Sequence, residues 1–263
     1  MNIDRTTVAL RQRSVIETMD LAVAVIRRHW IAVPALGAAG ILPWALLDWW
    51  LIGRAGDEEP WAVFWYPFLL LVAAQIPLAT APLTAFLGQA LFEPRPRAGA
   101  ALVTAWRAAP RLLAAGLLRG VFSIIPPVLL AWPAHLVEAI VLEGQGFGAA
   151  WRRAAALRGA DAGASPLLLL LAAPVLIAAL AVVAGTAGML HGLLLHADPW
   201  RPGDWGMMAD PGRSPAVHLA VWAAVAYLAV VRFFAYIDLR TRAEGWALDL
   251  DLRRTAARIE GAR

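Results

Sequence analysis

The sequence predicts an all-α polytopic membrane protein: a bundle of six membrane segments with one proline-turned hairpin, accompanied by short cytoplasmic interfacial helices. Hydrophobic residues make up 60% of the 263 residues, and the mean hydropathy is +0.63. Two stretches without a charged residue, Trp61 to Phe92 and Ala162 to Ala197, are 32 and 36 residues long. Because about 20 apolar helical residues span a bilayer core, these stretches predict membrane crossings and not buried helices of a soluble protein.

The run from 112 to 143 decides the topology, because its 32 residues are too many for one crossing and few for two. It is apolar apart from Arg119, His135, Glu138 and Glu143, and prolines interrupt its middle. A single crossing gives five spans, with 11 arginines on each side. A hairpin that turns at the prolines gives six spans, with 19 arginines inside, three outside and Arg119 in the membrane. The positive-inside rule for short loops favours the hairpin and places both termini in the cytoplasm.

The elements follow from this choice. Residues 1–29 form a cytoplasmic amphipathic segment, residues 30–237 the membrane bundle and residues 238–263 a cytoplasmic tail of the same domain. The six segments are expected, in order, at Trp30–Gly53, Trp61–Leu91, Leu112–Pro126, Trp132–Leu142, Pro166–Leu195 and Pro215–Ile237. Tryptophans near the ends of the first two segments fit an aromatic belt at the membrane interface. The third and fourth segments are short, so the hairpin either crosses fully or re-enters the side from which it came.

Three arginine-bearing segments precede the odd-numbered spans and share an alanine-rich amphipathic pattern. They run from 13 to 28, from 97 to 107 and from 146 to 158. Such segments fit short helices that lie in the inner interface with their arginines toward anionic headgroups. The arginines expected at headgroups are Arg27, Arg28, Arg107, Arg152 and Arg153. The alternative is that these segments are only the frayed cytoplasmic starts of the spans they precede.

Arg119 and Glu138 are expected to form a buried ion pair inside the hairpin. Arg119 lies about 10 residues before the centre of the turn and Glu138 about 8 residues after it, so antiparallel helices would bring them to similar depths. A lone charge inside a bilayer is costly, and each residue therefore needs a partner, a water-filled cavity or a route to the interface. The alternative for Arg119 is to snorkel to the inner interface.

The carboxyl end is predicted to continue the last span as a helix beyond the membrane and to form a docking surface. Apolar residues recur there at helical intervals, and charged residues supply a solvated face. The residues expected at this docking surface are Tyr236, Asp238, Arg240, Arg242, Glu244 and Trp246. A plain snorkelling tail is the alternative.

The stretch from Tyr236 to Leu250, with the three arginine-bearing segments, resembles a family of uncharacterised bacterial six-span membrane proteins. That family is similar to the membrane domain attached to some glycerophosphodiester phosphodiesterases. The resemblance implies the fold, a bacterial inner-membrane location and company with other membrane proteins. It does not carry over hydrolase activity, because the longest polar segment, after Asp238, has only about 25 residues.

Composition and spacing argue against several functions. The absence of cysteine excludes disulfides, thiolate metal sites and cysteine nucleophiles. The 23 basic residues are all arginine and flank the spans on one side, as topology requires, so nucleic-acid binding is not expected. No histidine pair has the spacing of a helical metal motif, and neither a metal nor a cofactor is expected. For His191, His196 and His218, interfacial hydrogen bonding is the expected role, with a metal or proton site as the alternative.

The expected function is that of a non-enzymatic membrane protein that scaffolds a complex or binds lipid. Its expected partners are membrane lipids and other membrane proteins. A small solute or lipid transporter is the alternative, because helices interrupted by Gly and Pro often line substrate sites. Pro and Gly are also common in ordinary membrane helices, which is why transport takes second place.

Overall fold

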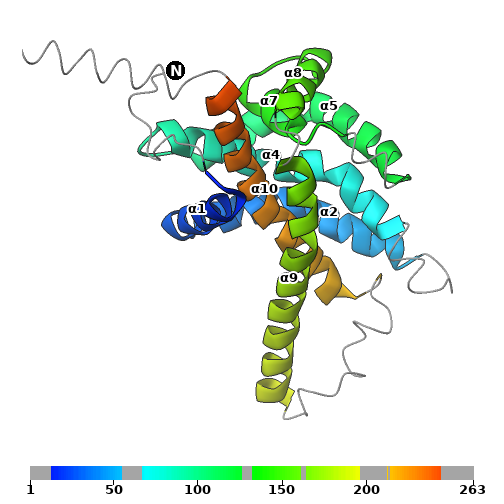
Figure 1. Ribbon diagram of the computed structural model, residues 1–263. Coiled ribbons are helices and arrows are strands. Elements are labelled where there is room, and N and C mark those ends of the chain that lie inside the picture. Colours follow the sequence, from blue (N-terminus) through cyan, green and yellow to red (C-terminus); the bar gives the residue numbers. More distant parts are fainter. Residues whose placement is uncertain are drawn as a thin grey trace, which may run out of the picture.

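The computed structural model describes residues 13–54, 67–125, 132–160, 164–195, 212 and 214–243, and within them it contains eight helices and no strand. The predicted all-α class is confirmed. The helices are α1 (Val15–Arg28), α2 (Ala32–Ile52), α4 (Leu69–Phe92), α5 (Ala98–Ser123), α7 (Leu136–Leu142), α8 (Phe147–Ala160), α9 (Ala164–Leu195) and α10 (Pro215–Ala243). Figure 1 shows α4 and α10 in the middle of the bundle, while α9 projects away from the other helices.

Three helices in the described part of the chain, α2, α4 and α10, are long and apolar enough to cross a membrane. They correspond to the first, second and sixth predicted spans. A shorter apolar stretch, Leu171–Thr186, lies within α9, where the fifth span was expected. Large apolar side chains are exposed along α2 and α5, from Leu42 to Leu51 and from Leu102 to Ile125. Exposed apolar surface of this extent is unfavourable in water and is compatible with a membrane location.

The third and fourth predicted spans are not found as two full crossings. α5 runs without a break from Ala98 to Ser123, so the segment from 97 to 107 is the start of this helix and not a separate element. α7 has seven residues, which rise only about 10 Å, too little to cross a bilayer. A proline precedes it and a turn follows it: Pro133 lies just before α7, and Gly144, with a φ of 65°, comes after it.

α1 and α8 are helices separate from the spans they precede, as the interfacial-helix prediction requires of them. At the start of α1, Ser14 and Glu17 form a reciprocal capping box, in which each side chain accepts a hydrogen bond from the other's backbone N–H. α1 ends at Arg28, with His29 as its C-cap, and α2 begins at Ala32. The position of α1 and α8 at a membrane surface remains a prediction.

α4 is the central helix, in contact with α2, α5, α7 and α10. Glycines allow the closest approaches. A Cβ atom at Gly40 of α2 would lie 2.2 Å from the carbonyl oxygen of Ala79, and one at Gly116 of α5 would lie 2.3 Å from that of Ala74. Small residues at crossing points are a common way for membrane helices to associate, because they allow backbones to touch. This tight packing sets α2 and α5 close against α4.

Candidate functional site

A buried ion pair lies where α4, α7 and α10 meet. The Nε atom of Arg232, on α10, donates to Oε1 of Glu138, on α7, at 2.7 Å. Its Nη2 atom donates to Oγ1 of Thr80, on α4, at 3.2 Å. The Glu138 side chain has no exposed surface, and that of Arg232 is 14% exposed. In an apolar environment such a pair is stable only if both charges stay engaged, so these contacts tie three helices together.

Arg119 does not hold the position that the sequence predicted for it. Glu138 pairs with Arg232 instead, and the Nε atom of Arg119 is buried without a hydrogen-bond partner. The Arg119 guanidinium lies 5.7 Å from the ring centroid of Trp132 and feels both the attraction of Glu138 and the repulsion of Arg232. The predicted pair of Arg119 with Glu138 is wrong because α10 carries another arginine, Arg232, into the core.

Three charged side chains therefore share one region of the bundle, two of them positive. Their arrangement keeps Arg232 engaged with Glu138 and leaves a surplus positive charge at Arg119. The second carboxylate oxygen of Glu138, Oε2, and the hydroxyl of Thr84 on α4 are also buried without a hydrogen-bond partner. Such a region can hold fixed charge within an apolar bundle, which is a property of both structural cores and ion pathways.

A second polar cluster surrounds Glu143, the residue that follows α7. The hydroxyl of Tyr236 donates to its Oε1 atom. Nε of Arg153 and Nη1 of Arg240 lie 3.5 Å and 3.6 Å from the same oxygen, and Nε2 of Gln145 donates to Oε2 at 2.8 Å. One carboxylate thus joins the loop after α7 to α8 and to the end of α10.

The start of the predicted docking surface is taken up by the chain itself. Tyr236 is buried against Glu143, and Asp238 pairs with Arg242 one turn further along α10. Asp238 also accepts a hydrogen bond from the backbone N–H of Arg13 at 3.1 Å, ahead of α1. These two side chains are therefore not available to another protein. Arg240 and Arg242 lie in the same network, and Glu244 and Trp246 are outside the described residues.

Four of the five arginines expected at lipid headgroups are exposed. They are Arg27, Arg28, Arg107 and Arg152. Arg153 is the exception, because it is partly buried and contacts Glu143. The exposed arginines lie on α1, α5 and α8, which contain the three predicted segments at 13–28, 97–107 and 146–158.

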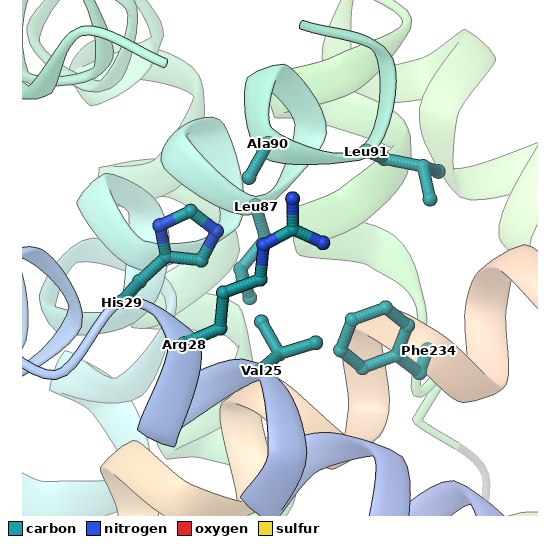
Figure 2. A pocket seen from close by; sticks show the side chains of 7 residues that line it. All are labelled: Val25, Arg28, His29, Leu87, Ala90, Leu91 and Phe234. Carbon is teal, nitrogen blue, oxygen red and sulfur yellow. The ribbon is translucent and has the colours of Figure 1, made fainter. Parts of the chain in front are cut away.

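A small pocket lies beside Arg28, between α1, α4 and α10. Its lining consists of Val25, Arg28, His29, Leu87, Ala90, Leu91 and Phe234. Figure 2 shows the Arg28 side chain reaching across it between His29 and Phe234. The volume is about 20 Å³, enough for about one water molecule and too small for an organic substrate. Burial, and secondly the charge of Arg28, lower the pKa of His29 below its ordinary value, so its ring is neutral near pH 7.

The histidines do not form a metal site in the described part of the chain. His218, at the start of α10, is buried, stacked on Phe68 with ring centroids 4.1 Å apart, and its Nε2 atom lies 2.6 Å from the carbonyl oxygen of Gly212. Among the residues whose side chains are described, no group of three His, Cys, Asp or Glu residues could hold a metal ion. The side chains of His191 and His196 are outside that set.

Two charged residues of the core, the fully buried Asp48 and the partly buried Arg232, are not among the candidates that the sequence suggested. Asp48 is the only charged residue of α2, and Nε2 of Gln75 donates to its Oδ1 atom at 2.7 Å. The available signal was an isolated charge within an apolar run, which is by default a candidate functional residue in a membrane helix.

Comparisons of this chain with protein-family models, with curated proteins and with solved structures find no match.

Proposed function

We propose that this chain is a non-enzymatic integral membrane protein that binds anionic lipid at its cytoplasmic face and supports a membrane complex. The supporting observation is that exposed arginines lie next to exposed large apolar side chains on the segments that precede the spans. Arg27 and Arg28 end α1 and are followed by Trp30 and Ile31, which are 70% and 64% exposed. An arginine beside an exposed apolar ring matches the two layers of a bilayer interface, headgroup and acyl boundary.

The same pattern recurs on α5. Trp106 is 81% exposed, and the neighbouring Arg107 is exposed as well. The buried clusters support a stable, non-catalytic core, because Glu138, Glu143 and Asp238 all have partners within the chain. Lipid contact is thus proposed for the outer surface of the bundle and not for a cavity within it.

Lipid binding is tested by thermal unfolding of the purified protein in a neutral detergent, with added phosphatidylglycerol or phosphatidylcholine. Phosphatidylglycerol should stabilise the parent protein more than phosphatidylcholine does, and added salt should reduce the difference. Because each arginine near an anionic surface contributes about 1 kcal/mol, Arg27→Gln with Arg28→Gln should weaken phosphatidylglycerol binding by roughly 30-fold.

Arg54→Gln is the matched control, since Arg54 is exposed just beyond the opposite end of α2, where it lies 3.8 Å from the ring centroid of Trp50. This variant should retain the preference for phosphatidylglycerol. Equal stabilisation by the two lipids, or an equal loss of preference in Arg54→Gln, would count against the proposed inner-face site.

For the topology, we infer six membrane segments with both termini in the cytoplasm of a bacterial inner membrane. The hairpin formed by the second half of α5 and by α7 re-enters the side from which it came, because α7 is too short to cross. α9, with 32 residues, is the fifth segment. The uneven distribution of arginines supports this orientation.

Cysteine labelling tests the orientation in this cysteine-free chain. In intact cells an impermeant maleimide should label a cysteine introduced at Ala209 and not one introduced at Ala256. After the membrane is permeabilised, both should react. Labelling of Ala256→Cys in intact cells, with Ala209→Cys protected, would reverse the proposed orientation.

Transport of a small solute or lipid is the second candidate, and the surplus positive charge at Arg119 favours it. Prolines within α2, α4 and α9 could also interrupt helices at a binding site. A panel of solutes in the same thermal assay separates the two candidates. An anionic solute that stabilises the parent protein and not an Arg119→Gln variant would favour transport.

The resemblance to the membrane domain of glycerophosphodiester phosphodiesterases remains a prediction, and scaffold and accessory roles are consistent with it.

A further inference from the structure

Asp48 is a wholly buried carboxyl group in the half of the bundle away from Glu138. It belongs to α2, and it contacts α4 through Gln75, whose Nε2 atom donates to Oδ1 at 2.7 Å. The indole N–H of Trp222, on α10, is a donor beside the same carboxyl, although the two groups lie outside hydrogen-bond geometry. Ile52, Phe68, Val72 and Val221 belong to the apolar cluster around this position.

The hydrogen bonds around Asp48 do not balance for a charged carboxylate. Oδ2 of Asp48 and Oε1 of Gln75 are both buried without a partner. A carboxylate has only acceptors, so it cannot satisfy the amide oxygen of Gln75. A neutral carboxylic acid carries a proton on Oδ2, and this proton gives the amide oxygen the donor that it lacks. The acid and the amide would then form two parallel hydrogen bonds, with every polar atom of the pair except the second amide hydrogen engaged.

The surroundings also favour the neutral form. α2 has no other charged residue, and α4 has none. On α10, Arg232 is engaged by Glu138, and His218 is stacked on Phe68 with Nε2 at the carbonyl of Gly212. Arg54, beyond the end of α2, lies over the ring of Trp50. Thus no cation in the described residues pairs with Asp48, and burial without a counter-charge disfavours the ionised form of a carboxyl group.

We propose that Asp48 is a proton-binding site of the bundle, at which the neutral acid donates through Oδ2 to Oε1 of Gln75. The ligand is a single proton from water, and its binding removes one negative charge from the interior. This site is independent of the proposed lipid contacts, which lie on exposed arginines, and it differs in kind from Glu138, whose negative charge is balanced by Arg232.

Two matched substitutions test the protonation state through stability. Asparagine is an isostere of the neutral acid, and its amide can accept from Gln75 through Oδ1 and donate to Oε1 through Nδ2. Asp48→Asn should therefore have a melting temperature close to that of the parent. Glu138→Gln, which removes a charge that Arg232 requires, should have a much lower one. If Asp48 were ionised, Asn would lose the carboxylate and place an N–H₂ group against the Trp222 indole, and both variants would be destabilised.

Infrared spectroscopy supplies a readout that does not depend on stability. The parent protein at neutral pH should show a C=O stretching band of a protonated carboxyl group that shifts in D₂O. This band should be absent from Asp48→Asn, present in Glu138→Gln, and shifted to higher frequency in Gln75→Leu, because the acid loses its acceptor. A carboxylic-acid band of equal intensity in the parent and Asp48→Asn would show that Asp48 is ionised and would overturn the proposal.

Discussion

Replacing Glu138 by glutamine should destabilise the protein by about 3–5 kcal/mol. The change leaves the guanidinium of Arg232 without the carboxylate that it contacts at 2.7 Å, and it removes the only negative charge described between Arg232 and Arg119. Thermal or denaturant unfolding of the purified variant in detergent measures the loss. Thr80→Val is the matched control, because it removes a longer, neutral contact to the same arginine and should cost only about 1 kcal/mol.

A double-mutant cycle identifies the partner of Glu138. Glu138→Gln combined with Arg232→Gln should cost much less than the sum of the two single losses, because no uncompensated charge remains. Arg119→Gln alone should be nearly neutral or stabilising, since Arg119 has no hydrogen bond to Glu138 and repels Arg232. A large loss in Arg119→Gln, with strong coupling to Glu138→Gln, would instead restore the pair expected from the sequence.

Replacing Gly116 by valine should destabilise the contact between α4 and α5 by about 3 kcal/mol. The new Cβ atom would lie 2.3 Å from the carbonyl oxygen of Ala74, and backbone atoms cannot turn aside as a flexible side chain can. The crossing is also close one turn further along α5, where a Cβ atom built at Gly120 would lie 3.1 Å from the Ala74 Cβ atom. The two helices would have to separate along this whole crossing.

Gly185→Ala is the control for Gly116→Val. Gly185 lies in α9, and a Cβ atom there meets nothing within 4 Å. Alanine at this position should leave stability unchanged or raise it by about 0.5–1 kcal/mol, because glycine is the poorer helix former. Comparable losses in the two variants would mean that a general effect of replacing helical glycines, and not the close approach to Ala74, accounts for the result.

Length and hydropathy were enough to predict the helices that depend only on local sequence. The first predicted span, Trp30–Gly53, agrees closely with α2, and the capping residues that begin α1 are visible in the sequence as Ser14 and Glu17. The hairpin was harder, because hydropathy does not show where a helix continues. The alanine-rich stretch after Ala98 runs directly into the apolar stretch after Leu112, so that one helix replaces a cytoplasmic segment and a span.

The partners of the buried charges could not be read from the sequence for a different reason. The position of Glu138 in an apolar run indicates that it needs an arginine, but it does not indicate which helix supplies that arginine. Arg232 is 94 residues away along the chain, and only the packing of α10 against α4 brings it to Glu138. Likewise, the sequence predicts Tyr236 and Asp238 at a docking surface, but they are engaged within the chain by Glu143, after α7, and by the backbone N–H of Arg13, ahead of α1.

The pairing of Glu138 with Arg232 also sets an order of events during synthesis. Chains are made from the amino end, so Glu138 leaves the ribosome long before the arginine that neutralises it. Until α10 arrives, Arg119 is the cation that the growing hairpin itself provides, near enough to attract Glu138 without bonding to it in the finished bundle. Glu143 is in the same situation with respect to Tyr236 and Arg240. α10, the last of the helices described, therefore completes both polar clusters. A nascent chain released before it would leave Glu138 without Arg232, and Glu143 with Gln145 and Arg153 but without Tyr236 and Arg240.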